Sequence, residues 1–280
     1  MKHPPTRPAA WQVCALSVAF AIALHPGRAQ AQTVTVFPAG PPTSFPWLIT
    51  AGADGNLWFT GVLPYVGRMT TAGAVTLFPT QQQFGNPHGI TAGPDGNVWF
   101  TISSGNRIGR VTPEGVITEF PLPTPDSRPY GIATGADGAL WFTESLVNRI
   151  GRMTTSGVVT EFESDGNPAY ITMGPDGALW FTAPPGNKIG RILPSGVVTE
   201  FPLPTAGSSP FGIVAGPDGA LWFAEYSGNR IGRITTAGTI TEFNIPTPHS
   251  RPHQIAVGPD GRFGSRRTRA ERSDGSRHPA

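Results

Sequence analysis

The chain reads Ala-Gly-Ala-Asp-Gly-Asn-Leu-Trp-Phe at residues 51–59, and close copies of this stretch return four more times along the sequence. The later copies begin at Ala92, Thr134, Met173 and Ala215. Their turn aspartate recurs at spacings of 41, 42, 39, 42 and 42 residues, at Asp54, Asp95, Asp137, Asp176, Asp218 and Asp260. A repeat of this length is typical of β-propeller blades, which hold four short strands in about 40–45 residues.

The third copy shows how the strands of one repeat are expected to lie. Tyr130–Thr134 predicts a first strand, and Asp137 and Gly138 form a tight turn because aspartate caps its own backbone there and glycine takes the strained position. The remaining strands are expected at residues 139–143, 149–154 and 158–162. The chain also holds 36 glycines and 31 prolines, and no segment has a helical pattern. We therefore predict an all-β propeller of four-stranded blades, with five complete blades and a broken sixth.

The first 31 residues do not belong to the repeat. Lys2 and Arg7 precede an apolar run from Val13 to Leu24, and Ala29-Gln30-Ala31 resembles a cleavage site. This pattern predicts a secretory signal peptide over residues 1–31, and the run is too short to span a bilayer of about 30 Å. The only cysteine, Cys14, lies in this segment, so no disulfide is expected in the mature protein. A periplasmic or secreted location follows from this interpretation.

The other end of the chain also departs from the pattern. The propeller repeats are expected over residues 32–261, and the repeat stops within a motif after Gly258–Gly261. Residues 262–280 contain six arginines and no strand pattern. Back-translation in a shifted frame permits Ala-Leu-Trp-Phe-Ala-Glu and Ile-Gly-Arg-Ile-Thr at the spacing of the other repeats. We therefore interpret residues 262–280 as an unstructured tail read out of frame, from either a real frameshift or a sequence error.

The charge of the chain changes once its two ends are set aside. The whole sequence has 20 basic and 18 acidic residues and a pI near 9.0. Residues 1–31 account for three of the bases, and residues 262–280 account for six bases and two acids, which leaves 11 bases and 16 acids in the body. A mildly acidic body does not favour binding to nucleic acid, and no membrane-spanning segment is predicted.

The basic residues of the repeats have a simple structural interpretation. Asn-Arg-Ile-Gly-Arg occurs at residues 106–110, 148–152 and 229–233, with a lysine variant at 187–191. These side chains are expected to cover the edges of Trp and Phe rings and to pair with the acids that recur opposite them, Glu119, Glu161, Glu200 and Glu242.

The positions that vary between the repeats are better candidates for function. The residue after the proline that opens each first strand is, in order, Trp47, His88, Tyr130, Ala169, Phe211 and His253. First strands line the central channel of a propeller, so these slot residues are expected to gather at one mouth of it. They would form either a ligand site or a plug that closes the channel. Glu144 and Glu225 end second strands, where they could bind a cation or lie in solvent.

Several motifs resemble those of the virginiamycin B lyases, also called streptogramin lyases. The similarity extends from about Thr33 to Gly261, and in the third repeat it rests on Arg-Pro-Tyr-Gly-Ile at 128–132, Leu-Trp-Phe-Thr-Glu at 140–144 and Asn-Arg-Ile-Gly-Arg at 148–152. The resemblance implies a seven-bladed propeller and a Mg²⁺-dependent elimination that opens the ester ring of streptogramin B antibiotics. In this family a histidine acts as base, two glutamates hold the metal, and the histidine of an Arg-Pro-His motif contacts the substrate.

Only part of this machinery maps onto the chain. Arg251-Pro252-His253 matches the substrate-contacting motif, so His253 is the first candidate for substrate binding, with Tyr130, Trp47 and Phe211 beside it. The family's base and the glutamates that hold Mg²⁺ belong to a seventh blade that this sequence lacks. Asn86 stands where the family has glutamate before His88, so no residue is assigned a catalytic or metal-binding role.

Three functions remain open from the sequence. The first is a lyase-like propeller that is inactive as this chain stands because it ends before the catalytic blade. The second is a non-catalytic propeller that presents its aromatic mouth to a small molecule, a peptide or a protein. The third is a metal-dependent lactonase. Elimination gives a new double bond, hydrolysis adds water, and binding alone leaves the ligand intact, so the product distinguishes them.

Overall fold

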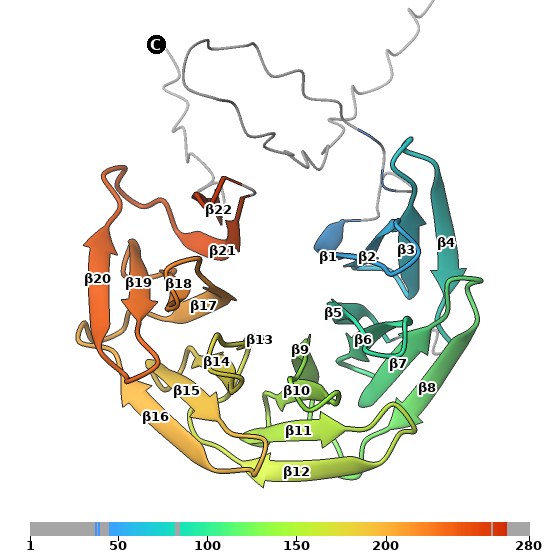
Figure 1. Cartoon of the computed structure of the whole chain (residues 1–280), viewed down its shortest axis with the longest axis horizontal. Coiled ribbons are helices and arrows are strands. Elements are labelled where there is room, and N and C mark those ends of the chain that lie inside the picture. Colours follow the sequence, from blue (N-terminus) through green and yellow to red (C-terminus); the bar gives the residue numbers. More distant parts are fainter. Residues whose placement is uncertain (1–36, 38, 40–44, 82–84, 259, 268–280) are drawn as a thin grey trace, which may run out of the picture.

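The structure, a computed structural model, describes residues 37, 39, 45–81, 85–258 and 260–267. Within them, five four-stranded antiparallel sheets and one two-stranded sheet are arranged as successive blades in an arc (Figure 1). The predicted all-β propeller is confirmed, with five complete blades and part of a sixth. The predicted signal peptide and residues 268–280 of the predicted tail lie outside the described residues. The described part of the chain has no helix long and apolar enough to cross a membrane.

Each complete blade has four strands that pair in sequence order, and the first strands lie nearest the centre (Figure 1). The first strands are β1 (Pro46–Ala51), β5 (Pro87–Ala92), β9 (Pro129–Thr134), β13 (Ile171–Met173) and β17 (Pro210–Ala215). The second strands are β2 (Leu57–Gly61), β6 (Val98–Ile102), β10 (Leu140–Glu144), β14 (Leu179–Ala183) and β18 (Leu221–Glu225). The third strands are β3 (Tyr65–Met69), β7 (Arg107–Val111), β11 (Arg149–Met153), β15 (Lys188–Ile192) and β19 (Arg230–Ile234). The fourth strands are β4 (Val75–Pro79), β8 (Ile117–Pro121), β12 (Val159–Glu163), β16 (Val198–Pro202) and β20 (Ile240–Asn244).

The repeated aspartate and tryptophan hold each blade together. In the third blade, the indole Nε1 of Trp141 donates to Asp137 at 3.1 Å, and the Arg152 guanidinium donates to the same carboxylate at 2.7 Å. Arg152 also lies over the Trp141 ring, which stacks on Phe162 with 5.7 Å between ring centroids. The first basic residue of the motif pairs with the opposing acid, as between Arg149 and Glu161 at 3.0 Å. The structural role predicted for these basic residues is confirmed.

A buried threonine in the second strand links the inner ends of neighbouring blades. Thr101 of blade 2 accepts a hydrogen bond from the backbone N–H of Gly89 at 2.8 Å and donates to the carbonyl of Tyr130 in blade 3 at 2.8 Å. Equivalent donations run from Thr60 to the His88 carbonyl and from Thr143 to the Ala169 carbonyl. These hydroxyls fix the slot residues relative to one another, because a buried donor or acceptor left unpaired is costly.

The sixth blade departs from the prediction at its outer strand. Residues 262–280 were expected to be unstructured, yet β22 (Phe263–Arg267) pairs antiparallel with β21 (Pro252–Val257). The turn between them repeats that of the other blades, with the Gly258 N–H donating to the Arg262 carbonyl at 2.7 Å. Phe263 also packs against Trp222 of blade 5 at 4.5 Å between ring centroids. The turn and this aromatic contact together extend the sheet by one strand.

Candidate functional site

One cavity of about 690 Å³ lies where the first strands of the blades begin. It is lined by all six slot residues that the sequence analysis singled out: Trp47, His88, Tyr130, Ala169, Phe211 and His253. The ladder between first and second strand is irregular just after the opening proline in every blade except the fourth. Such bulges bend a strand and redirect its side chains, which accounts for the slot side chains turning to the centre.

The aromatic slot residues contact one another around the cavity. The His88 ring lies 4.7 Å from Trp47 and 3.7 Å from Tyr130, measured between ring centroids. On the other side, Phe211 and His253 approach to 4.7 Å. Aromatic pairs at these distances contribute about 0.5–1.5 kcal/mol beyond the burial of their area. The cavity wall is therefore a continuous aromatic surface that a flat ligand group can stack against.

Tyr170 occupies the centre of this surface, and the sequence analysis missed it. It follows the Ala169 slot, and its ring lies 5.3 Å from Tyr130, 6.2 Å from Phe211 and 5.9 Å from His253. Its hydroxyl is 3.2 Å from that of Tyr130, and only 7% of the residue is exposed. Blades 2, 3 and 5 have glycine at this position, so a tyrosine there was a signal that sequence reasoning could have used. Tyr170 therefore lines the cavity and connects the aromatic residues on its two sides.

His88 presents an uncharged imidazole to the cavity. It is 7% exposed, and its Nδ1 has no hydrogen-bond partner among the described residues. Burial lowers the pKa of His88 to about 4, and the nearby His253 contributes to that shift. At neutral pH the ring is therefore neutral, and it adds no charge to the cavity wall.

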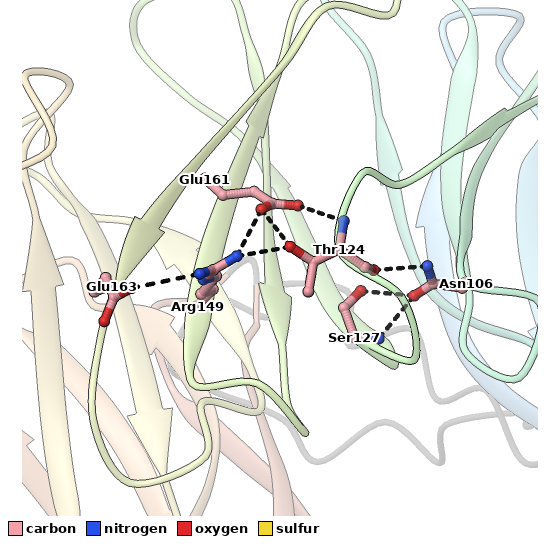
Figure 2. A network of polar contacts seen from close by, with 6 residues as sticks. All are labelled: Asn106, Thr124, Ser127, Arg149, Glu161 and Glu163. Atoms are coloured by element: carbon pink, nitrogen blue, oxygen red, sulfur yellow. Dashed lines mark hydrogen bonds and ion pairs between the residues drawn. The ribbon is translucent and has the colours of Figure 1, made fainter.

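Arg128 and Tyr130 line the cavity. The loop that precedes them is hydrogen-bonded to both flanking blades through Ser127 and Thr124 (Figure 2). On one side, the side-chain Oδ1 of Asn106 accepts from the Ser127 N–H at 2.9 Å and from the Ser127 hydroxyl at 2.7 Å. On the other side, the Thr124 hydroxyl donates to Glu161 at 2.6 Å. Such fixed loops place side chains precisely enough for binding because they need little ordering when a ligand arrives.

Glu144 and Glu225 were expected either to bind a cation or to lie in solvent, and the second alternative is wrong. Both residues are 0% exposed, and the two carboxylate oxygens of each have no hydrogen-bond partner in the described structure. Burial raises the pKa of Glu144 to about 8, with the charge of Glu161 adding to the rise, and it raises that of Glu225 to about 7, with Glu242 adding. The sequence did not reveal their burial, because the loops that cover these strand ends come from other parts of the chain.

The described residues do not fit the magnesium site that the family resemblance implies. They contain no group of three or more histidine, cysteine, aspartate or glutamate side chains placed to hold a metal ion. Glu144 and Glu225 lie in different blades, and burial favours their protonated form. Magnesium takes ionised carboxylates in near-octahedral geometry, so neither residue is assigned to it.

The fold and the cavity define a β-propeller with an aromatic, ligand-sized site at one mouth of its channel. Residues 32–268 match the virginiamycin B lyase family, and the chain belongs to that family.

Solved structures agree with this assignment. Virginiamycin B lyase from Staphylococcus aureus is 43% identical, with a TM-score of 0.77 over 80% of this chain and 78% of that one. A catalytically inactive histidine-to-alanine form of the S. aureus enzyme with quinupristin is 41% identical, with a TM-score of 0.78 over 83% and 81% of the two chains. A streptogramin B lyase is 38% identical, with a TM-score of 0.76 over 82% and 85%. A comparison with curated proteins found no match.

Proposed function

We propose that the aromatic cavity binds a streptogramin B antibiotic and that the 280-residue chain does so without opening its ring. The observation that carries the binding proposal is the convergence of Trp47, Tyr130, Phe211 and His253 on one cavity. A relative of this family at 41% identity was crystallised with quinupristin. Aromatic rings around a cavity of this size suit a cyclic peptide that carries aromatic groups of its own.

The proposal of inactivity rests on the residues that the chain supplies. Elimination from the ester needs a base at the carbon that loses its proton, and charge stabilisation at the neighbouring carbonyl oxygen. His253 matches the family's substrate-contacting motif, but the described residues offer no fitting magnesium ligands. His88 has a pKa of about 4, far below the near-neutral value that suits a general base at physiological pH.

Incubation with quinupristin and Mg²⁺, followed by chromatography and mass spectrometry, tests both parts. The expected result is saturable binding and recovery of the intact cyclic antibiotic. Ring opening at unchanged mass would overturn the inactivity, and a product heavier by one water would identify a hydrolase. Absence of binding would instead favour a propeller that recognises a different small molecule, peptide or protein.

Variants locate the binding within the cavity. His253→Ala and Tyr130→Ala each remove a ring from the aromatic wall, and each is expected to weaken quinupristin binding roughly three- to tenfold, the factor that one aromatic contact supplies. Val158→Ala is the control, because Val158 is 63% exposed at the turn before β12 and does not line the cavity. Equal losses in all three variants would show that binding occurs elsewhere.

We also propose that the protein is exported and that its mature form begins at Gln32. The basic start, apolar run and small-residue cleavage pattern of residues 1–31 support this. Expression of the full chain in a Gram-negative host, with fractionation and N-terminal sequencing, tests it. An uncleaved N-terminus in the cytoplasmic fraction would refute the proposal.

A further inference from the structure

The residues that line the cavity include a basic side chain and no acidic one. Arg128 is that basic side chain. His88 is neutral because burial lowers its pKa to about 4. The fixed charge at this mouth is therefore positive, although the propeller body as a whole carries more acidic than basic residues.

Arg128 also differs from the repeated arginines of the blades. Arg149 and Arg152 each pair with a carboxylate of their own blade, at 3.0 and 2.7 Å. Arg128 makes no ion pair within the described structure, and its residue is exposed at the rim of the cavity. Its guanidinium is consequently free to meet a charged group on a ligand.

The backbone conformation of Arg128 is the one that its position in the repeat has in the following blades. Its φ is 55°, although a proline follows it and disfavours helical conformations at the preceding residue. The Arg128 carbonyl accepts from the Ser145 N–H at 3.3 Å, and Ser127 just before it is fixed by Asn106. Asn167, Ser209 and Arg251, which precede the opening prolines of blades 4, 5 and 6, have φ values of 56°, 52° and 46°, so this conformation belongs to the repeat. In blade 3 it holds Arg128 beside the cavity.

We propose that Arg128 is an anion-binding residue and that the cavity prefers ligands that join an aromatic ring to a carboxylate. The ring stacks on the wall at Trp47 and Tyr130, and the carboxylate pairs with the planar guanidinium of Arg128, whose fork of donors matches two carboxylate oxygens. This inference rests on the proposed function, because both place the ligand in the same cavity. An ester opened by elimination ends in a carboxylate, so a ring-opened depsipeptide also belongs to the preferred class.

Two peptides that differ only in charge provide the test: N-acetyl-Phe-Phe with a free carboxylate, and its C-terminal amide. Calorimetric titration at low salt should show the carboxylate form binding on the order of fivefold more tightly, the factor of an exposed ion pair. The preference should shrink as salt is added, because salt screens exposed charges. Arg128→Gln should abolish it, and Arg128→Lys should retain part of it.

Arg251→Gln is the matched control. Arg251 also precedes a proline with positive φ, 46°, but its guanidinium lies over the Tyr226 ring, 5.9 Å from the centroid. This variant should keep the preference. Equal binding of the two peptides by the unmodified protein, or a preference that survives Arg128→Gln, would overturn the anion site alone. If neither peptide binds, or if Tyr130→Ala leaves the binding of the amide unchanged, the ligand site itself is refuted.

Discussion

Replacing Glu144 with glutamine is expected to stabilise the protein at neutral and basic pH, and to have little effect near pH 4. The carboxyl group is buried without a hydrogen-bond partner in the described structure, and its pKa is raised to about 8. In the unfolded chain the group ionises near its ordinary value of 4.5. Between these two values the folded state holds a proton that the unfolded state has lost, so stability falls as pH rises from about 4.5 to about 8.

The size of the effect follows from the shift. Each pKa unit corresponds to about 1.36 kcal/mol, so the full shift would cost roughly 5 kcal/mol at pH 9. Relaxation of the protein and water penetration around the buried carboxylate relieve part of this cost, and we expect about 2–4 kcal/mol. Glutamine has nearly the same shape and no charge. The variant should therefore melt roughly 5–10 °C higher than the unmodified protein at pH 9 and close to it at pH 4.

Thermal unfolding followed by circular dichroism from pH 4 to pH 9 measures this difference. Glu163→Gln is the control, because the Glu163 side chain is 89% exposed and its contact with Arg149 is 3.4 Å long. It should change stability by less than about 0.5 kcal/mol at any pH. A Glu144→Gln effect of equal size at pH 4 and pH 9, or a destabilisation at pH 9, would show that the carboxylate is charged and paired, and would refute the reasoning.

Substitutions at four further positions test the residues that hold the cavity in place. Thr143→Val removes the hydroxyl that bridges blades 3 and 4 and should cost about 1–3 kcal/mol in denaturant unfolding; Ala224→Thr, which adds a hydroxyl at the same place in blade 5, should raise the melting temperature instead. Asn106→Gly allows the positive φ of 53° but removes the side-chain hydrogen bonds to Ser127 and Thr124, so ligand affinity and thermal stability should both fall. Unchanged affinity in calorimetry would show that the loop does not need these hydrogen bonds. Tyr170→Ala should destabilise the protein by roughly 3–5 kcal/mol and enlarge the cavity, whereas Tyr170→Phe should leave both nearly unchanged, as a melting curve and a crystal structure of each variant would show.

The strands were predictable because every blade repeats the same turn residues and the same aromatic residues at fixed spacing. The third-blade strands lie within one residue of their expected bounds, since the Asp137 turn and the Trp141 stack recur at fixed spacing and leave little choice of register. The outer strand β22 was not predicted, because its residues have lost the repeat pattern. Its pairing depends on the turn at Gly258–Gly261 and on the contact of Phe263 with Trp222, which lies in another blade.

The candidate site was predictable to the extent that it follows from the repeat. Comparing equivalent positions placed the six slot residues at one mouth, because a propeller brings the same position of every blade to the same level. Tyr170 and Arg128 also line the cavity, but they were missed because only the slot position of each repeat was compared. Tyr170 follows the slot residue Ala169, and Arg128 precedes the proline that opens its strand. The burial of Glu144 was also missed, since it depends on long-range packing over the end of β10.

We propose that the aromatic mouth of the channel is the ligand site. A crystal structure of the chain in complex with quinupristin tests it most directly. We expect one antibiotic molecule in the cavity, in contact with Trp47, Tyr130, Phe211 and His253, with its ring intact. An antibiotic bound on another surface, with the cavity occupied only by solvent, would contradict it.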